Sequence, residues 1–208
     1  IRDFPAFLKS LDAKAEKTGQ DSPLLRKIAG QVLQDKRQFD DAIKEYQLSL
    51  ELQPFDGEVH EGLVKCYQES GQQDLAIRQL MKRIDFDRHN TSLYRQLVEQ
   101  TTNRPDLAER AATSLVEQAP TEAESHQALA ELRESQDRYS EAISHWRRVA
   151  ELRSLEPTGL LKLAEAQAHI KDAAGAKQTL KALRSRQWPE RFGDVDDRIH
   201  TLEESLTP

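Results

Sequence analysis

Two short segments of this sequence have residue types whose spacing could support metal or phosphate chemistry. His60-Glu61 begins like the helix of a zinc protease, but Val64 stands where that helix needs a second histidine. Gly57 and Gly62 have the spacing of a phosphate-binding loop, but Leu63-Val64 follows where a lysine and then a serine or threonine are required. The sequence therefore predicts neither site.

The remaining candidate ligands and nucleophiles do not combine into a site either. Asp194, Asp196 and Asp197 lack the central glycine and the closing glutamate of a calcium loop, so we interpret them as charges at a helix N-terminus. Cys66 is the single cysteine, and we expect it to be a buried structural thiol. The histidines form no metal-ligand spacing. We expect a non-catalytic protein without a metal or a cofactor.

The composition favours an all-α protein. The good helix formers Ala, Leu, Glu, Gln, Lys and Arg dominate, and apolar and polar residues never alternate over the length of a strand. The net charge of −6 argues against nucleic acid as a partner, because its recognition depends on clustered Lys and Arg. No run of 18 or more apolar residues is present, so we expect no membrane partner.

The single cysteine also bears on the compartment, because one cysteine cannot form an internal disulfide. A chain without an internal disulfide fits the cytoplasm best, and the periplasm is the alternative. The chain opens at Ile1 without a methionine or an apolar leader, so we interpret it as a piece of a longer protein or a processed form.

A fixed spacing of alanines divides the chain into repeats. These alanines are 34, 32, 34 and 34 residues apart: Ala42, Ala76, Ala108, Ala142 and Ala176. A second series follows them by four positions: Tyr46, Leu80, Ala112, Trp146 and Leu180. Self-similarity with a period near 34 indicates a helical repeat array. The small alanine lets two antiparallel helices approach closely, and stacked repeats then share one continuous core.

Capping signals mark the boundaries of the repeats. Ser22 can cap a helix whose first turn tolerates Pro23, and Gly71 is expected to end a helix in the left-handed conformation. We expect a single array over residues 1–208 that divides as follows: an N-terminal helix at 1–20, repeats at 22–56, 57–90, 91–121, 122–156 and 157–189, and a C-terminal capping helix at 190–208. The apolar stripe of that capping helix is Phe192, Val195, Ile199, Leu202 and Leu206.

The repeats resemble the tetratricopeptide repeat family, whose signature is W-x2-L-G-x2-Y, then A-x3-F, then P. The second repeat shows this pattern as His60-x2-Leu63-Val64-x2-Tyr67 and then Ala76-x3-Leu80. The resemblance covers residues 22–188, although the leading tryptophan is absent throughout. It implies a right-handed superhelical solenoid of about five helix-turn-helix repeats with a capping helix at each end. It also implies that the first helices line a concave groove that receives a peptide.

By repeat position, the resemblance assigns a set of polar side chains to this groove. The candidates for partner binding are Lys27, Gln31, Glu58, Glu61, Lys65, Arg95, Glu99, Gln127, Glu131 and Glu165. The cations among them lie in the first three repeats, so we hypothesise that the C-terminal half of the groove favours a basic or polar peptide. The alternative is that these residues form a solvated helix face in a protein that is acidic overall.

One subfamily holds the acidic C-terminus of chaperones with a clamp of Lys, Asn and Arg. Lys27 matches the lysine of this clamp, but Gln31 and Gly62 stand where asparagines are needed. Ser92 and Gln96 replace the lysine and arginine of the third repeat. The sequence therefore argues against binding of a chaperone tail.

The function that we expect is a non-catalytic protein-protein interaction scaffold that binds a peptide or protein in the groove, as part of a larger protein. Two alternatives remain open. The repeats could present substrate to the catalytic domain of a multidomain enzyme, or the groove or an end helix could hold a second copy of the chain.

Overall fold

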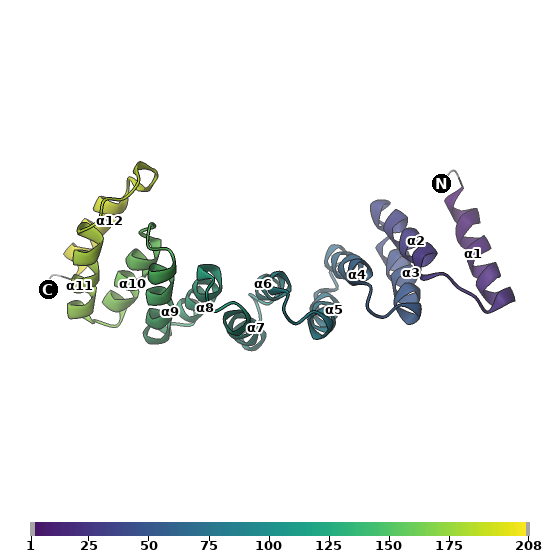
Figure 1. Ribbon diagram of the computed structural model, residues 1–208, viewed down its shortest axis with the longest axis horizontal. Helices are drawn as coiled ribbons and strands as arrows, with labels where there is room; N and C mark the ends of the chain where they lie inside the picture. The colour runs from purple at the N-terminus through teal and green to yellow at the C-terminus, as the bar shows by residue number, and fades with distance from the viewer. Residues whose placement is uncertain (1–2, 207–208) are drawn as a thin grey trace. The chain divides into compact units, whose positions relative to one another are not determined.

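The computed structural model describes residues 3–206 as α-helices and one short 3-10 helix, with no β-strand among them (Figure 1). Residues 1, 2, 207 and 208, which include Ile1 and the outer ends of both predicted flanking segments, lie outside the described residues. The helices are α1 (Phe4–Thr18), α2 (Pro23–Asp35), α3 (Phe39–Leu52), α4 (Gly57–Glu69), α5 (Gln73–Phe86), α6 (Thr91–Gln100), α7 (Pro105–Gln118), α8 (Ala123–Ser135), α9 (Tyr139–Leu152), α10 (Thr158–His169), α11 (Ala173–Arg184), the 3-10 helix η1 (Glu190–Phe192) and α12 (Val195–Ser205). The all-α prediction is confirmed.

The helices belong to two compact units, Ile1–Leu93 and Tyr94–Pro208, and the boundary falls inside α6. In the first unit α2 packs against α3, and α4 packs against α5. In the second unit α8 packs against α9, and α10 packs against α11. Helix-turn-helix repeats are therefore present in both units, as predicted.

Short polar side chains determine where the first helix of a repeat begins. The Ser22 hydroxyl accepts a hydrogen bond from the Leu25 amide at 3.4 Å, and Pro23 occupies the first turn of α2, as predicted. The Asp56 carboxylate accepts hydrogen bonds from the Glu58 and Val59 amides at 3.0 and 3.2 Å. These caps satisfy backbone donors that a helix otherwise leaves without partners.

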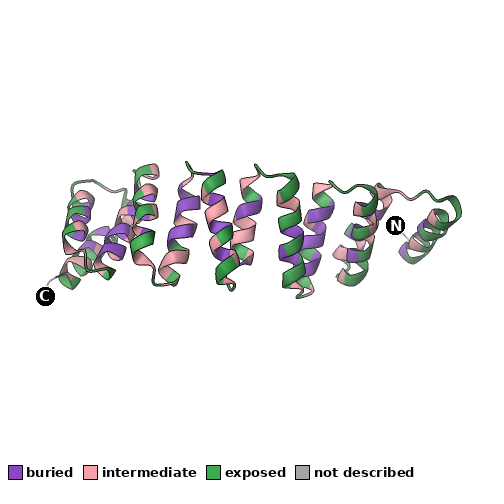
Figure 2. Ribbon diagram, turned by 90° about the horizontal axis from the view of Figure 1, so that it is seen from below, coloured by how far each residue is buried: buried purple, intermediate pink, exposed green. Residues whose placement is uncertain are grey.

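The two periodic series of the sequence form the core of both units. None of the five anchor alanines is more than 2% exposed. The residues four positions after them are equally buried, including Tyr46 in the first unit and Trp146 in the second. Figure 2 shows that buried positions follow one side of each helix, where it faces its neighbours. Close approach at alanine and interlocking of the larger residues therefore hold each helix pair together.

The turn inside four of the five repeats contains a residue in the left-handed conformation. Gly71 has φ 75°, as predicted, but the equivalent position is occupied by Arg37 (φ 59°), Asp137 (φ 58°) and Lys171 (φ 62°). In each case the next amide donates to a carbonyl five residues earlier, as from Gln72 to Tyr67 at 2.7 Å. This hydrogen bond satisfies a carbonyl at the helix end, so the turn persists even where the residue is not glycine.

Each unit has an additional helix, α1 at the start of the first unit and α12 at the end of the second. Leu11 of α1 is buried, and so are Val195 and Ile199 of α12, which pack with Leu180 and Leu183 of α11. The predicted capping helix is therefore present, with one correction: Phe192 lies in η1 ahead of α12, and it packs against the same cluster. Pro189 precedes η1, and Gly193 and Asp194 separate η1 from α12.

A buried arginine that the sequence did not reveal ties α1 to the first repeat. The side chain of Arg26 is only 3% exposed, and its guanidinium pairs with Asp12 of α1, Asp21 of the loop and Glu45 of α3. The three distances are 2.7, 2.7 and 2.9 Å. Three carboxylates around one guanidinium raise its pKa although burial opposes this, so the buried charge is fully paired.

Candidate functional site

Four of the predicted groove residues lie together in the first unit. Gln31 of α2 and Glu58, Glu61 and Lys65 of α4 line a hollow of about 230 Å³. Gln34, Tyr46 and Gly62 complete its lining. The hollow therefore combines amide, carboxylate, ammonium and phenol groups, which include both donors and acceptors of hydrogen bonds.

Tyr46 forms the floor of this hollow because two glycines leave space for its ring. A Cβ placed on Gly30 would lie 2.6 Å from the ring, and a Cβ placed on Gly62 would lie 2.6 Å from Cζ. The Tyr46 hydroxyl donates to Oε1 of Gln34 at 2.8 Å. Burial raises the pKa of this phenol, so it remains a hydrogen-bond donor at neutral pH. Apart from the glycines themselves, no pattern in the sequence indicates this contact.

The charged groups beside the hollow pair with one another. Lys27 contacts Glu58 at 2.9 Å and Asp56 at 3.0 Å, and both contacts raise the lysine pKa. Lys65 contacts Glu61 at 2.8 Å and lowers the pKa of that carboxyl. Lys27 itself does not line the hollow. The predicted residues of this unit therefore form ion pairs that leave little net charge.

A second hollow in the second unit has a different character. Its volume is about 340 Å³, and it is lined by Val98 and Thr102 near the end of α6, Ala108 of α7, and Ala128, Glu131, Leu132 and Ser135 of α8. Glu131 is the one predicted groove residue in this lining. Its carboxylate accepts a hydrogen bond from Gln127 at 2.8 Å. The surroundings suit an apolar side chain with a polar group at the rim.

Two more carboxylates of the second unit, Glu124 and the predicted Glu165, pair with cations of the same chain. Arg153, in the turn after α9, pairs with Glu124 and donates to Gln127 at 3.1 Å. Lys162 and Arg198 contact Glu165 at 2.8 and 2.6 Å. Burial favours the neutral form of Glu165, but these two cations lower its pKa. These partners come from positions outside the predicted groove set, so the local acidic excess that the sequence suggested is largely compensated.

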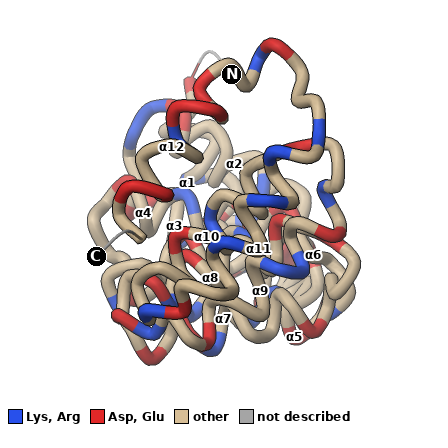
Figure 3. The backbone as a smooth tube through the Cα atoms, turned by 90° about the vertical axis from the view of Figure 1, so that its left-hand side faces the viewer, with Lys and Arg blue, Asp and Glu red and all other residues tan. Residues whose placement is uncertain are grey.

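Two more predicted residues, Arg95 and Glu99, lie on α6 and line neither hollow. Arg95 pairs with Glu122. The Glu99 side chain is exposed and makes no hydrogen bond or ion pair within residues 3–206. Figure 3 shows that residues of both charges are interspersed along the chain, in agreement with this pairing.

His60 and His126, which occupy the same position in two repeats, are packing residues. Both are buried, and Nε2 of each lies within hydrogen-bond distance of a proline carbonyl, at 2.8 Å for Pro54 and 3.1 Å for Pro120. Because a carbonyl only accepts, each Nε2 carries a proton and each Nδ1 is an acceptor. The donor to Nδ1 is Gln79 for His60 and His145 for His126.

The nucleophile and ligand candidates are inert in the described part of the chain. Cys66 is buried, and burial raises its thiol pKa to about 11, so it is protonated at neutral pH. Among residues 3–206, no three His, Cys, Asp or Glu side chains form a cluster that could hold a metal ion.

The comparisons with known proteins agree with the repeat geometry. The model of the tetratricopeptide repeat family matches residues 29–90, which lie in the first unit. No curated protein sequence matches the chain. Among the helices of residues 3–206, none is long and apolar enough to cross a membrane.

Several solved structures share the fold at low sequence identity. The C-terminal part of a TPR repeat-containing protein from Cytophaga hutchinsonii is 20% identical, with 86% of this chain and 72% of that chain covered and a TM-score of 0.61. MamA is 17% identical, with 88% and 92% covered and a TM-score of 0.57. The TPR protein YrrB is 15% identical, with 93% and 92% covered and a TM-score of 0.57.

Proteins built from this repeat generally act as protein-interaction scaffolds. Residues 29–90 match the tetratricopeptide repeat family, and the helix pairs of both units share the fold of solved tetratricopeptide repeat proteins.

Proposed function

We propose that the chain is a non-catalytic scaffold that binds a peptide segment of a protein partner on the first helices of its repeats. The observation that carries this proposal is the polar hollow between α2 and α4, where Gln31, Glu61 and Lys65 line the same space as Tyr46. An extended peptide has a backbone donor and an acceptor at nearly every residue, and it needs both kinds of partner from the protein. This hollow offers both within one contiguous surface.

In the second unit, the hollow beside Glu131 suits an apolar side chain of a peptide bound to that unit. Val98, Ala128 and Leu132 supply apolar walls, and Glu131 supplies an acceptor at the rim. Glu124 and Glu165 already pair with cations of the chain, so they offer little negative charge to a basic peptide. We therefore favour a polar segment with an apolar side chain over a strongly basic segment.

A related fold supports a peptide as the ligand. YrrB is described as a TPR protein with an unusual peptide-binding site, and it shares the fold over 93% of this chain. Because the two sequences are only 15% identical, no individual contact residue of YrrB can be assigned to a position in this chain. The residues that we propose for partner binding therefore come from the geometry of this chain alone.

The test uses peptides selected from a random phage-displayed library against the whole chain. Their affinity is then measured by fluorescence anisotropy for the wild type and for the double variant Gln31→Ala/Lys65→Ala. Both side chains are exposed on the hollow, so the variant should fold normally. We expect its affinity to fall about tenfold, which corresponds to the loss of one or two hydrogen bonds.

The matched control is Arg78→Ala/Lys82→Ala, which removes two exposed side chains from α5. This helix is the second helix of the repeat that contains Lys65. We expect this control to bind like the wild type. Equal weakening of both variants, or no selected peptide that depends on Gln31 and Lys65, would count against the proposal.

A further inference from the structure

The helix pair α11 and α12 carries a second surface that shares no residue with the proposed groove. Among the helices of residues 3–206, α11 is the one that has basic residues and no acidic residue. Its three cations are Lys177, Lys181 and Arg184. They follow the spacing i, i+4 and i+7, so they lie along one face of the helix. This face is locally basic in a chain whose net charge is −6.

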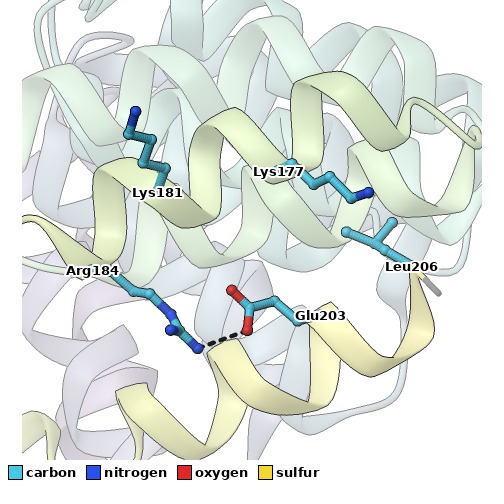
Figure 4. A pocket seen from close by; sticks show the side chains of 5 residues that line it. All are labelled: Lys177, Lys181, Arg184, Glu203 and Leu206. Carbon is cyan, nitrogen blue, oxygen red and sulfur yellow. Dashed lines mark hydrogen bonds and ion pairs between the residues drawn. The ribbon is translucent and has the colours of Figure 1, made fainter.

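The basic face borders a hollow of about 440 Å³, which is larger than the hollow above Tyr46 and the hollow beside Glu131. Figure 4 shows the three cations projecting from α11, with Glu203 and Leu206 on the opposite side from α12. Leu206 also packs against the core cluster of this repeat, so it forms a fixed apolar part of the lining. The methylene groups of the lysines extend this apolar surface below their charged ends.

The contacts that α12 makes with α11 indicate which chemical groups this basic face can bind. Glu203 of α12 accepts from the guanidinium of Arg184 at 2.6 Å, while Leu206, one helical turn later, contributes to the apolar packing. Lys177 and Lys181 stand on the same face of α11, and no carboxylate within residues 3–206 pairs with either of them. The face therefore has one carboxylate in place and two exposed cations without one.

We propose that this face docks an acidic amphipathic segment of a protein partner. Carboxylates of the segment pair with Lys177 and Lys181, and an apolar side chain enters the hollow against Leu206. The segment thus makes the same two kinds of contact that α11 already receives within the chain: the ion pair of Glu203 with Arg184 and the apolar packing of Leu206. Charge complementarity supports this occupant, because an acidic segment meets a basic face in an otherwise acidic protein.

Nucleic acid is the weaker match to the same cations. Sequence-tolerant binding of single strands needs aromatic side chains on which bases stack, and the lining of this hollow has none. Three cations in a chain of net charge −6 also provide a small electrostatic attraction for a polyanion. An acidic peptide with one apolar residue uses both the charges and the hollow.

The probe for the test is a fluorescein-labelled helical peptide with two glutamates four residues apart and a leucine three residues after the first. We expect Lys177→Glu/Lys181→Glu to lower the affinity of the whole chain for it by about tenfold, measured by fluorescence anisotropy. Both lysines are exposed, so the fold should persist, which far-ultraviolet circular dichroism checks. The matched control Lys9→Glu/Lys14→Glu makes the same charge change on α1 and should leave the affinity unchanged.

A gain of affinity provides an independent check that misfolding cannot produce. Glu203→Gln releases Arg184 for the incoming peptide, and we expect binding to tighten about threefold. Unchanged or weaker binding of this variant would overturn the assignment to this hollow. Equal weakening by the α1 control would overturn it too, as would tighter binding of an oligothymidylate than of the peptide, which would point to nucleic acid. Because these variants leave α2 and α4 intact, failure here is distinguishable from failure of the groove proposal.

Discussion

At the scale of single residues, the contact between Tyr46 and two glycines packs α2, α3 and α4 together and forms part of the hollow. The ring lies where Gly30 and Gly62 have no side chain, with both approaches at 2.6 Å from an added Cβ. Neither helix could come as close to the ring with any other residue at these positions. The glycines are therefore packing residues, although Gly62 first stands out for its spacing from Gly57.

We predict that Gly62→Ala destabilises the chain by about 1–3 kcal/mol, because the added methyl group overlaps a buried ring. Chemical denaturation measures this change. Gly57→Ala is the control: its added Cβ would meet only Arg83 at 3.8 Å, and alanine favours the helix. A Gly62→Ala variant as stable as the Gly57→Ala variant would contradict the close packing around Tyr46.

A second residue-scale prediction concerns buried His126 and its partly buried neighbour His145. Burial lowers the pKa of His145 from its ordinary value of 6.5, with further lowering by Arg133 and His126 and opposition from Glu109 and Glu141. Since the folded chain holds this proton less tightly than the unfolded chain, His145 contributes stability above its ordinary pKa that is lost as the pH falls through 6.5.

The variant His145→Gln should therefore lose less stability than the wild type between about pH 7.5 and about pH 5.5. Glutamine is the residue that the second repeat uses at this position, where Gln79 donates to His60. Thermal unfolding at the two pH values gives the comparison. The prediction fails if both proteins lose the same stability on acidification.

At the scale of elements, the turn between the two helices of a repeat adopts one conformation with four different residues. Arg37, Gly71, Asp137 and Lys171 all have positive φ, which is unfavourable for every residue except glycine. The hydrogen bond across each turn compensates for this cost. The geometry of the repeat thus overrides the local preference of the residue at this position.

We predict that Lys171→Gly stabilises the chain by about 0.5–1 kcal/mol, because relief of the left-handed strain exceeds the added entropy of the unfolded chain. Gly71→Ala should act in the opposite direction, by about 1 kcal/mol, although an added Cβ there meets nothing within 4 Å. Urea denaturation measures both changes. A destabilised Lys171→Gly variant would show that the lysine side chain, and not its backbone, matters in this turn.

At the scale of the whole molecule, the net charge of −6 is an average over two surfaces that differ in whether their charged residues have ion-pair partners. The groove candidates Lys27, Lys65 and Glu165 all have ion-pair partners within the chain. On α11, Lys177 and Lys181 have no carboxylate partner within residues 3–206. Charges that are already paired contribute less to the attraction of a ligand than unpaired charges do.

The two proposed surfaces should therefore respond differently to salt. We predict that raising the sodium chloride concentration from about 0.05 M to about 0.5 M weakens the acidic peptide on α11 and α12 by about tenfold. The same change should weaken groove peptides by less than about threefold, because hydrogen bonds and apolar contacts dominate there. Fluorescence anisotropy titrations at both concentrations provide the measurement. A steeper salt dependence for the groove peptides would contradict the charge pairing described for that surface.

The helices, the repeat and the core all follow from the linear order of the residues. The anchor alanines, Ser22 and Gly71 act through the backbone and through their nearest turns, so their effects are visible in a linear sequence. His60 and His126 are both buried, because equal positions in equal repeats have equal surroundings. Four of the ten predicted groove residues also gather at one hollow, because repeat position places them on adjacent first helices.

Which charges pair and where the hollows lie, by contrast, depends on how the helices pack. Arg153 and Arg198 reach Glu124 and Glu165 over 29 and 33 residues of sequence. The long arginine side chains could reach several carboxylates, and the packing of neighbouring helices selects one of them. Tyr46 meets Gly62 for the same reason, since only the distance between α2 and α4 makes the ring the floor of a hollow. Periodicity identifies which side of a helix is buried, whereas side-chain partners depend on separations that only the packed helices define.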